Sequence, residues 1–113
     1  MKILIVGGRD FNNYDLFLNI LEYYKHDITS IISGGASGAD SLAEKFATYY
    51  GIDITVIKPD WNIGKSAGII RNSKMIDMNP DMVIAFWDGK SKGTKDTIKK
   101  AYNKKIDTLI IYY

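Results

Sequence analysis

Short apolar runs alternate with amphipathic segments along the whole chain. Five of these runs are rich in isoleucine and valine and are not broken by polar residues, which is typical of strands buried on both faces of a parallel sheet. The sequence predicts strands at residues 3–6, 30–32, 54–57, 82–87 and 108–111. Two neighbouring parallel strands need a long crossover between them, and the amphipathic segments are long enough to supply it.

Four of these segments predict helices. Their apolar residues recur at i, i+3, i+4 and i+7, which places them on one helix face. The predicted helices cover residues 16–24, 39–50, 67–78 and 94–104. Right-handed crossovers put helices on both faces of a parallel sheet. We therefore expect a single α/β domain over residues 1–113, a three-layer sandwich around a five-stranded parallel sheet.

Composition and charge narrow the range of functions. The net charge of +2 is too small to indicate nucleic-acid binding by itself, and the absence of cysteine excludes disulfides and thiolate metal sites. A single histidine, His26, argues against a catalytic triad or a transition-metal site. No apolar stretch is long enough to cross a bilayer, and the first predicted strand leaves no room for a signal peptide. We expect a cytoplasmic protein with no membrane partner, no metal and no cofactor.

Three of the predicted strands end in loops of glycine and small polar residues, at residues 7–11, 33–40 and 88–94. Glycine lets the backbone approach a ligand closely, and a helix that begins after such a loop directs free N–H groups towards an anion. In parallel α/β sheets these loops share one edge, and ligands bind there where the strand order reverses. The three loops together predict a binding crevice.

The first loop carries the most specific chemistry. Gly7 and Gly8 expose the backbone, and Arg9 supplies a forked, permanently charged donor for a phosphate. The alternative is a tight turn in which Arg9 forms a salt bridge with Asp10 or a neighbour. A turn needs glycine but does not need arginine, which favours the ligand-binding interpretation.

In the second loop, Ser33, Gly34 and Gly35 are candidate ligand contacts. Ser37 and Asp40 stand three residues apart at a predicted helix start, so they predict a capping box. A cap explains Asp40 better than a catalytic role does.

The remaining candidates follow the third and fourth predicted strands. Trp61 either stacks on a base or covers the sheet edge, and Arg71 lies about one turn into the third helix, pointing either back into the crevice or out to solvent. The loop at residues 88–94 offers backbone donors and two hydroxyl groups, although a helix N-cap alone would explain Thr94. The lysines at residues 95–105 indicate a solvated helix face.

Four motifs occur in order: Gly-Gly-Arg-Asp-Phe at residues 7–11, Ser-Gly-Gly-Ala-x-Gly-Ala-Asp at 33–40, Asp-Trp at 60–61 leading to Gly-x-x-Arg-Asn at 68–72, and Phe-Trp-x-Gly-x-Ser-x-Gly-Thr at 86–94. Through them the chain resembles, over essentially its whole length, the small bacterial and phage proteins of the SLOG superfamily related to YspA and YpsA. The resemblance implies a Rossmann-like sheet of order 3-2-1-4-5, with the reversal between the first and fourth strands. It also implies a nucleotide or nucleotide-derived ligand, such as an ADP-ribose-type molecule.

The motifs and the resemblance together give one set of candidate ligand-binding residues. These are Gly7, Gly8, Arg9, Asp10, Phe11, Ser33, Gly34, Gly35, Ala36, Asp60, Trp61, Lys65, Arg71, Asn72, Trp87, Gly89, Ser91, Lys92, Gly93 and Thr94.

Related hydrolases of this superfamily, which resemble cytokinin-activating phosphoribohydrolases, carry Pro-Gly-Gly-x-Gly-Thr-x-x-Glu at the fourth loop. This chain has Thr97 at the glutamate position, Asp96 one residue earlier, and Arg71-Asn72 in place of an arginine–lysine pair. An oxocarbenium-like transition state needs a nearby carboxylate, so the change favours binding without turnover.

Three functions remain under comparison. The first is a ligand-binding module, serving either as a sensor or as a phage protein that sequesters a host immune signal. The second is a hydrolase of an N-glycosidic or phosphate bond, with Asp10, Asp40, Asp60 or Asp88 as the acid or base. The third is a nucleic-acid-associated protein, which the weak net charge argues against. The apolar carboxyl-terminal strand and its exposed edge further predict a homodimer or larger homo-oligomer.

Overall fold

Five parallel strands form one sheet in a computed structural model that describes all residues, 1–113. The elements in chain order are β1 (Lys2–Gly7), α1 (Tyr14–Tyr24), β2 (Ser30–Ser33), α2 (Ala39–Tyr50), β3 (Asp53–Val56), a 3-10 turn η1 (Trp61–Ile63), α3 (Ala67–Asp77), β4 (Met82–Trp87), α4 (Lys92–Asn103) and β5 (Asp107–Tyr112). Every predicted strand and helix is present, with its ends within two residues of the prediction.

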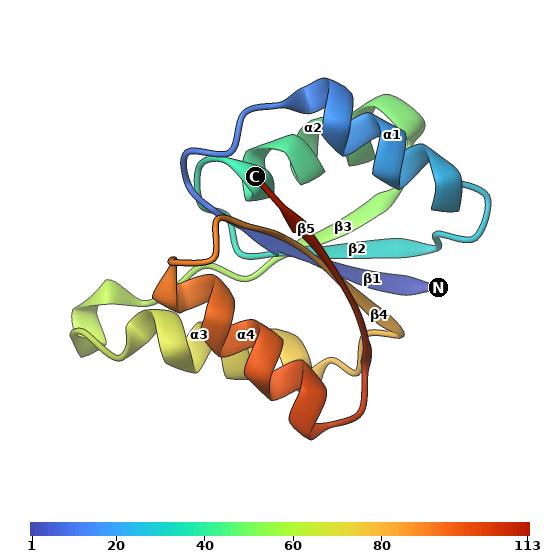
Figure 1. The fold of residues 1–113 in the computed structure, drawn as a ribbon. Coiled ribbons are helices and arrows are strands. Elements are labelled where there is room, and N and C mark those ends of the chain that lie inside the picture. Colours follow the sequence, from blue (N-terminus) through green and yellow to red (C-terminus); the bar gives the residue numbers. More distant parts are fainter.

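The strand order is β3-β2-β1-β4-β5, which confirms the predicted Rossmann-like sheet. β1 lies at the centre, where Leu4 is in register with Ile32 of β2 and with Val83 of β4. The chain builds outward from β1 to β3 and then crosses back to β4 and β5, so the order reverses between β1 and β4. The loops that follow these two strands lie at the same edge of the sheet (Figure 1).

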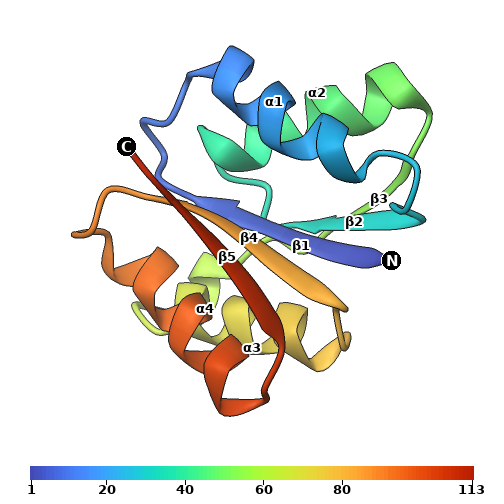
Figure 2. The same ribbon diagram turned by 45° about the vertical axis from the view of Figure 1, so that its right-hand side comes forward.

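Two helix layers enclose the sheet (Figures 1 and 2): α1 and α2 cover one face, and α3 and α4 cover the other. Alternate residues of β1 enter opposite cores, with Ile3 and Ile5 beneath α1 and α2, and Leu4 and Val6 beneath α3 and α4. The first core is strongly aromatic, because Phe86 of β4 stacks on two further phenylalanines at ring-centroid distances of 4.6 and 5.2 Å. This packing fixes the strand ends from which the loops emerge.

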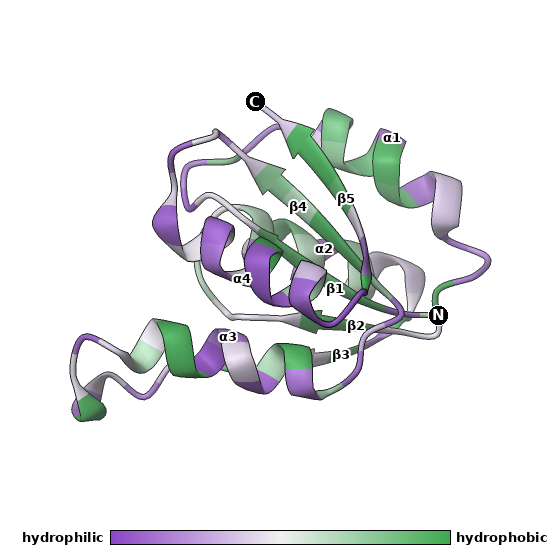
Figure 3. Ribbon diagram, turned by 60° about the horizontal axis from the view of Figure 1, so that its bottom comes forward, coloured by the Kyte–Doolittle hydropathy of each residue, from purple (hydrophilic) through white to green (hydrophobic).

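Most residues of α4 are hydrophilic (Figure 3), which agrees with the predicted lysine face of this helix. The segment between β3 and α3, which contains η1, projects beyond the carboxyl edge of the sheet (Figures 1 and 3). No helix combines the length and the apolar character that crossing a membrane requires.

Two predicted helix caps are wrong. α2 begins after Gly38 with no side-chain cap, and its first N–H, from Ala39, donates to the Gly8 carbonyl at 3.2 Å. Ser37 Oγ instead donates to the Arg9 carbonyl, so Ser37 and Asp40 form no capping box. α4 begins at Lys92 after an N-cap at Ser91, which places Thr94 inside the first turn, where it is buried.

Candidate ligand-binding crevice

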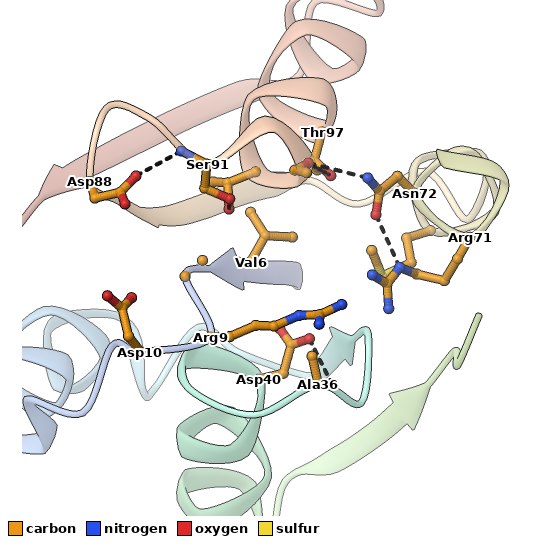
Figure 4. A pocket seen from close by; sticks show the side chains of 15 residues that line it. Val6, Arg9, Asp10, Ala36, Asp40, Arg71, Asn72, Asp88, Ser91 and Thr97 are labelled. Atoms are coloured by element: carbon orange, nitrogen blue, oxygen red, sulfur yellow. Dashed lines mark hydrogen bonds between the residues drawn. The ribbon is translucent and has the colours of Figure 1, made fainter. Parts of the chain in front are cut away.

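A cavity of about 430 Å³ opens at the carboxyl edge of the sheet, where the strand order reverses. We call it the inner cavity. Its walls come from the loops after β1, β2 and β4 and from the facing sides of α3 and α4 (Figure 4). Ten of the candidate ligand-binding residues line it: Gly7, Gly8, Arg9, Asp10, Ala36, Arg71, Asn72, Ser91, Gly93 and Thr94.

Two arginines from distant parts of the chain extend towards one another across this cavity (Figure 4). Arg71 is held in place, since Nη1 donates to the Gly34 carbonyl at 2.6 Å and Nε donates to Asn72 Oδ1 at 3.0 Å. Arg9 is exposed, and its guanidinium has no hydrogen-bond or ion-pair partner in the chain. The alternative, an ion pair of Arg9 with Asp10 or a neighbour, does not form, and Asp10 Oδ1 accepts a 2.6 Å hydrogen bond from the Tyr113 hydroxyl.

Asp40 is the carboxylate whose charge interacts with both arginines. Its side chain is 6% exposed, and Oδ2 accepts a 3.0 Å hydrogen bond from the Ala36 N–H. Burial raises the pKa of Asp40, while the Ala36 N–H and the Arg71 charge act in the opposite direction. Burial also lowers the pKa of Arg71, with Asp40 opposing this shift and Arg9 adding to it. Two guanidinium groups therefore face a single buried carboxyl group, and this end of the cavity attracts anions.

The opposite end of the inner cavity carries two further carboxylates, Asp10 and Asp88 (Figure 4). Asp88 Oδ1 accepts hydrogen bonds from the backbone N–H groups of Ser91 and Lys90, both at 2.8 Å, and these bonds lower its pKa. No group of three or more histidine, cysteine, aspartate or glutamate side chains is arranged to hold a metal ion. The cavity thus has a basic end and an acidic end.

The start of α4 adds backbone donors to the crevice. The N–H groups of Lys92, Gly93 and Thr94 have no acceptor within the chain, as expected for the first turn of a helix. Gly93 and Thr94 line the inner cavity, and the positive end of the helix dipole favours an anion there.

Asn72 joins α3 to α4. Its Nδ2 donates to the Gly93 carbonyl at 3.2 Å and to Asp96 Oδ2 at 3.1 Å. The same Asp96 oxygen forms a 2.6 Å ion pair with Lys100. The Asp96 carboxylate is therefore bonded to Asn72 and Lys100, while Thr97 lines the cavity. No free carboxylate replaces the glutamate of the related hydrolases on this helix.

A second cavity of about 390 Å³, the outer cavity, adjoins the first and shares Arg9, Ala36 and Arg71 with it. Three more candidates line it, namely Gly34, Gly35 and Trp61. Of the two directions considered for Arg71, the structure shows the one towards the crevice, where Arg71 lines both cavities.

Seven candidates line neither cavity: Phe11, Ser33, Asp60, Lys65, Trp87, Gly89 and Lys92. Phe11 packs in the core against Phe86, whereas Ser33 is a buried polar residue whose Oγ donates to the Asp40 carbonyl at 3.5 Å. Trp87 donates from Nε1 to the Ser91 carbonyl at 3.0 Å, which supports the loop before α4 from outside.

Several lining residues were absent from the candidate set. Asp40, Asp88 and Thr97 line the inner cavity, and Lys58 and Pro59 line the outer one. Thr97 stands three residues after Thr94 on the same helix face, and this spacing would have identified it. Lys58 and Pro59 follow β3 directly, so the rule that ligands bind beyond the carboxyl ends of strands would have included them.

Sequence similarity to known proteins identifies relatives of this chain. The model of the YspA, cpYpsA-related SLOG family matches residues 1–64, which is more than half of the chain. The Gene 61 protein of Mycobacterium phage D29 is 30% identical over 110 residues, covering 88% of this chain and 87% of that protein.

Among solved structures, DNA processing protein A (DprA) from Streptococcus pneumoniae superposes with a TM-score of 0.80 at 18% identity, which shows a shared fold. The match covers 96% of this chain and 49% of the DprA chain, so this chain spans about half the length of that one. The family match and the phage relative confirm the resemblance seen in the motifs, and the chain belongs to the YspA- and cpYpsA-related SLOG family.

Proposed function

We propose that the protein binds a nucleotide or nucleotide-derived small molecule of the ADP-ribose type, with its phosphate groups between Arg9 and Arg71. The observation that carries this proposal is the Arg9 guanidinium, which faces a second guanidinium and has no partner in the chain. Guanidinium groups bind phosphate through charge-assisted, two-pronged hydrogen bonds. The unpaired N–H groups at the start of α4 add donors on the other side of the cavity.

The biological role that fits a capture site without a catalytic glutamate is sensing or sequestration. The Gene 61 relative belongs to a phage, which favours sequestration of a host immune signal over sensing. Both roles require that the ligand leaves the protein unchanged.

Mass spectrometry combined with thermal melting tests the proposal. The protein is incubated with AMP, ADP and ADP-ribose, and the ligand is recovered after heat denaturation. A ligand at a hundredfold excess over its Kd should add about 2.7 kcal/mol to the free energy of unfolding. Stabilisation with intact ligand recovered supports binding, and no stabilisation by any of the three compounds contradicts it.

A hydrolase of the N-glycosidic bond is the second candidate, and Asp40 is the residue that favours it. Of the four aspartates considered as acid or base, Asp60 lines neither cavity. Asp10 has one oxygen bonded to Tyr113, and the backbone N–H groups that bond Asp88 lower its pKa, which disfavours Asp88 as an acid. Asp40 lines the inner cavity, and its raised pKa is a property of a general acid. Release of the free base in the same incubations, abolished by Asp40→Asn, would establish this activity.

A role on nucleic acid is a weaker candidate. The name of DprA concerns DNA processing, but the likeness to DprA is one of fold. The net charge is +2, and Lys100 on the lysine face of α4 is paired with Asp96. We expect the protein to cause no mobility shift of single-stranded DNA at physiological salt.

A further inference from the structure

The two cavities meet at the arginine pair, and this arrangement bears on the shape of the ligand. Each cavity alone is small on the scale of small-molecule pockets, which range over about 300–1,000 Å³. Arg9 and Arg71 belong to both walls. An anionic group held between them therefore touches both cavities, and a ligand anchored there can extend in two directions.

The outer cavity is suited to a planar ring. Trp61 on its wall is 57% exposed and belongs to neither hydrophobic core. Its indole takes part in none of the aromatic pairs of the chain. Gly34 and Gly35 lie on the same wall, where Arg71 packs over Gly34 and Lys58 packs over Gly35. Lys58 adds a cation with no ion-pair partner. A largely exposed indole beside two cationic side chains is a stacking surface for a nucleobase.

The turn that presents Trp61 is ordered by its own hydrogen bonds. Asp60 Oδ1 accepts from the Asn62 N–H at 3.1 Å, and the Gly64 N–H donates to the Trp61 carbonyl at 3.2 Å. Gly64 closes the turn with φ of 100°, which favours glycine. The indole is therefore held at the cavity by a fixed backbone.

The inner cavity has different chemistry. No aromatic residue lines it, and three carboxylates do, at Asp10, Asp40 and Asp88. The hydroxyl groups of Ser91 and Thr97 add further polar contacts. Carboxylates accept hydrogen bonds from hydroxyl groups, so this wall suits a sugar and offers nothing on which a base can stack.

We infer that the ligand is a nucleoside diphosphate carrying a second sugar, bound with its base against Trp61, its diphosphate between Arg9 and Arg71, and its terminal sugar in the inner cavity. The inference rests on the proposed function and adds the orientation of the ligand. It assigns base recognition to Trp61 and terminal-sugar recognition to Asp10, whose Oδ1 is bonded to Tyr113 and whose other oxygen has no donor in the chain.

Calorimetric titration with three ligands separates these roles. Ribose 5-phosphate has sugar and phosphate but no base, ADP has no second sugar, and ADP-ribose has both. Stacking of a base on an aromatic side chain is worth about 1–3 kcal/mol, which is roughly 5- to 150-fold in Kd. Trp61→Ala should weaken the binding of ADP and ADP-ribose by that factor and leave the affinity for ribose 5-phosphate unchanged. Trp61→Phe should restore most of the loss.

Two further variants complete the design. Ile63→Ala removes an exposed apolar side chain from the same turn, outside both cavities, and should change no affinity. Asp10→Asn keeps an acceptor for the Tyr113 hydroxyl but removes the charge, and should weaken ADP-ribose roughly tenfold while ADP is unaffected.

The outcomes distinguish this inference from the proposed function. If ADP-ribose binds and Trp61→Ala leaves its affinity unchanged, the orientation is wrong and the binding function stands. Equal weakening of ribose 5-phosphate by Trp61→Ala would show that Trp61 acts through the fold and would overturn the base contact. An Asp10→Asn variant that weakens ADP as much as ADP-ribose overturns the sugar contact. If the wild-type protein binds none of the three ligands, the proposed function and the inference both fail.

Discussion

Replacing Arg9 with alanine separates ligand binding from fold stability more cleanly than any other change at the crevice. The side chain is exposed and forms no hydrogen bond or ion pair with the chain. Its removal also relieves the repulsion from Arg71, which contributes to the lowered pKa of that residue. The free energy of unfolding should therefore change by no more than about 0.5 kcal/mol, as for surface substitutions generally.

The effect on affinity should be much larger. A hydrogen bond to a charged group is worth about 1.5–3 kcal/mol, which corresponds to a roughly tenfold to hundredfold increase in the Kd for ADP-ribose. Arg9→Lys should give an intermediate Kd, because lysine keeps the charge but not the two-pronged geometry.

Calorimetric titration and thermal melting of the same variants measure both effects. Lys90→Ala is the matched control, since Lys90 is an exposed cation on the loop before α4 that lines neither cavity. The Kd of this variant for ADP-ribose should stay within about threefold of the wild-type value, because the variant loses only a long-range attraction that salt screens. A lowered melting temperature with unchanged affinity in Arg9→Ala would refute the assignment and make Arg9 a structural residue.

Four further predictions follow from the same contacts. Arg71→Ala should lose affinity and also about 1–3 kcal/mol of stability in urea denaturation, because two protein hydrogen bonds disappear with it; unchanged stability would contradict this. Burial raises the pKa of Asp40, so the free energy of unfolding of wild type should fall relative to that of Asp40→Asn as the pH rises from about 4 through the raised pKa. The same difference between the two proteins at pH 4 and pH 8 would refute this. Gly38→Ala should cost at least about 1–3 kcal/mol, because Gly38 has φ of 75° and its Cβ would overlap the Gly8 carbonyl; a melting temperature equal to wild type would be inconsistent with this. Tyr112 on the edge strand β5 is 64% exposed, so light scattering at roughly tens of micromolar protein should give the mass of a dimer or larger oligomer. Tyr112→Lys should reduce that mass, and a monomer mass for wild type would count against this interface.

The fold was predictable from sequence because the signals for its layers are local. Unbroken apolar runs marked the buried strands, and the helical spacing of apolar residues marked the covering helices. The strand order required the motif resemblance, since hydrophobic pattern alone does not say which strand is central. The strand order placed the loop of Arg9 at the carboxyl edge, but the direction of Arg71, which lies within α3, remained open between the crevice and solvent.

The parts of the crevice that were missed depend on contacts between distant loops. The spacing of Ser37 and Asp40 predicts a capping box, but Ser37 Oγ donates to the Arg9 carbonyl and Asp40 Oδ2 accepts from the Ala36 N–H, so Asp40 lines the cavity without capping α2. Phe11 stands two residues after Arg9, yet it turns into the aromatic core beside Phe86. Sequence spacing gives the position of a loop residue along the chain but not the side of the loop on which its side chain packs.

A crystal structure of the protein with ADP-ribose would show whether the two arginines bind the phosphate groups. Phosphate oxygens should lie within about 3.2 Å of the guanidinium nitrogens of both Arg9 and Arg71, at the edge of the sheet between β1 and β4. A ligand bound at any other surface, with both guanidinium groups free of phosphate, would contradict it.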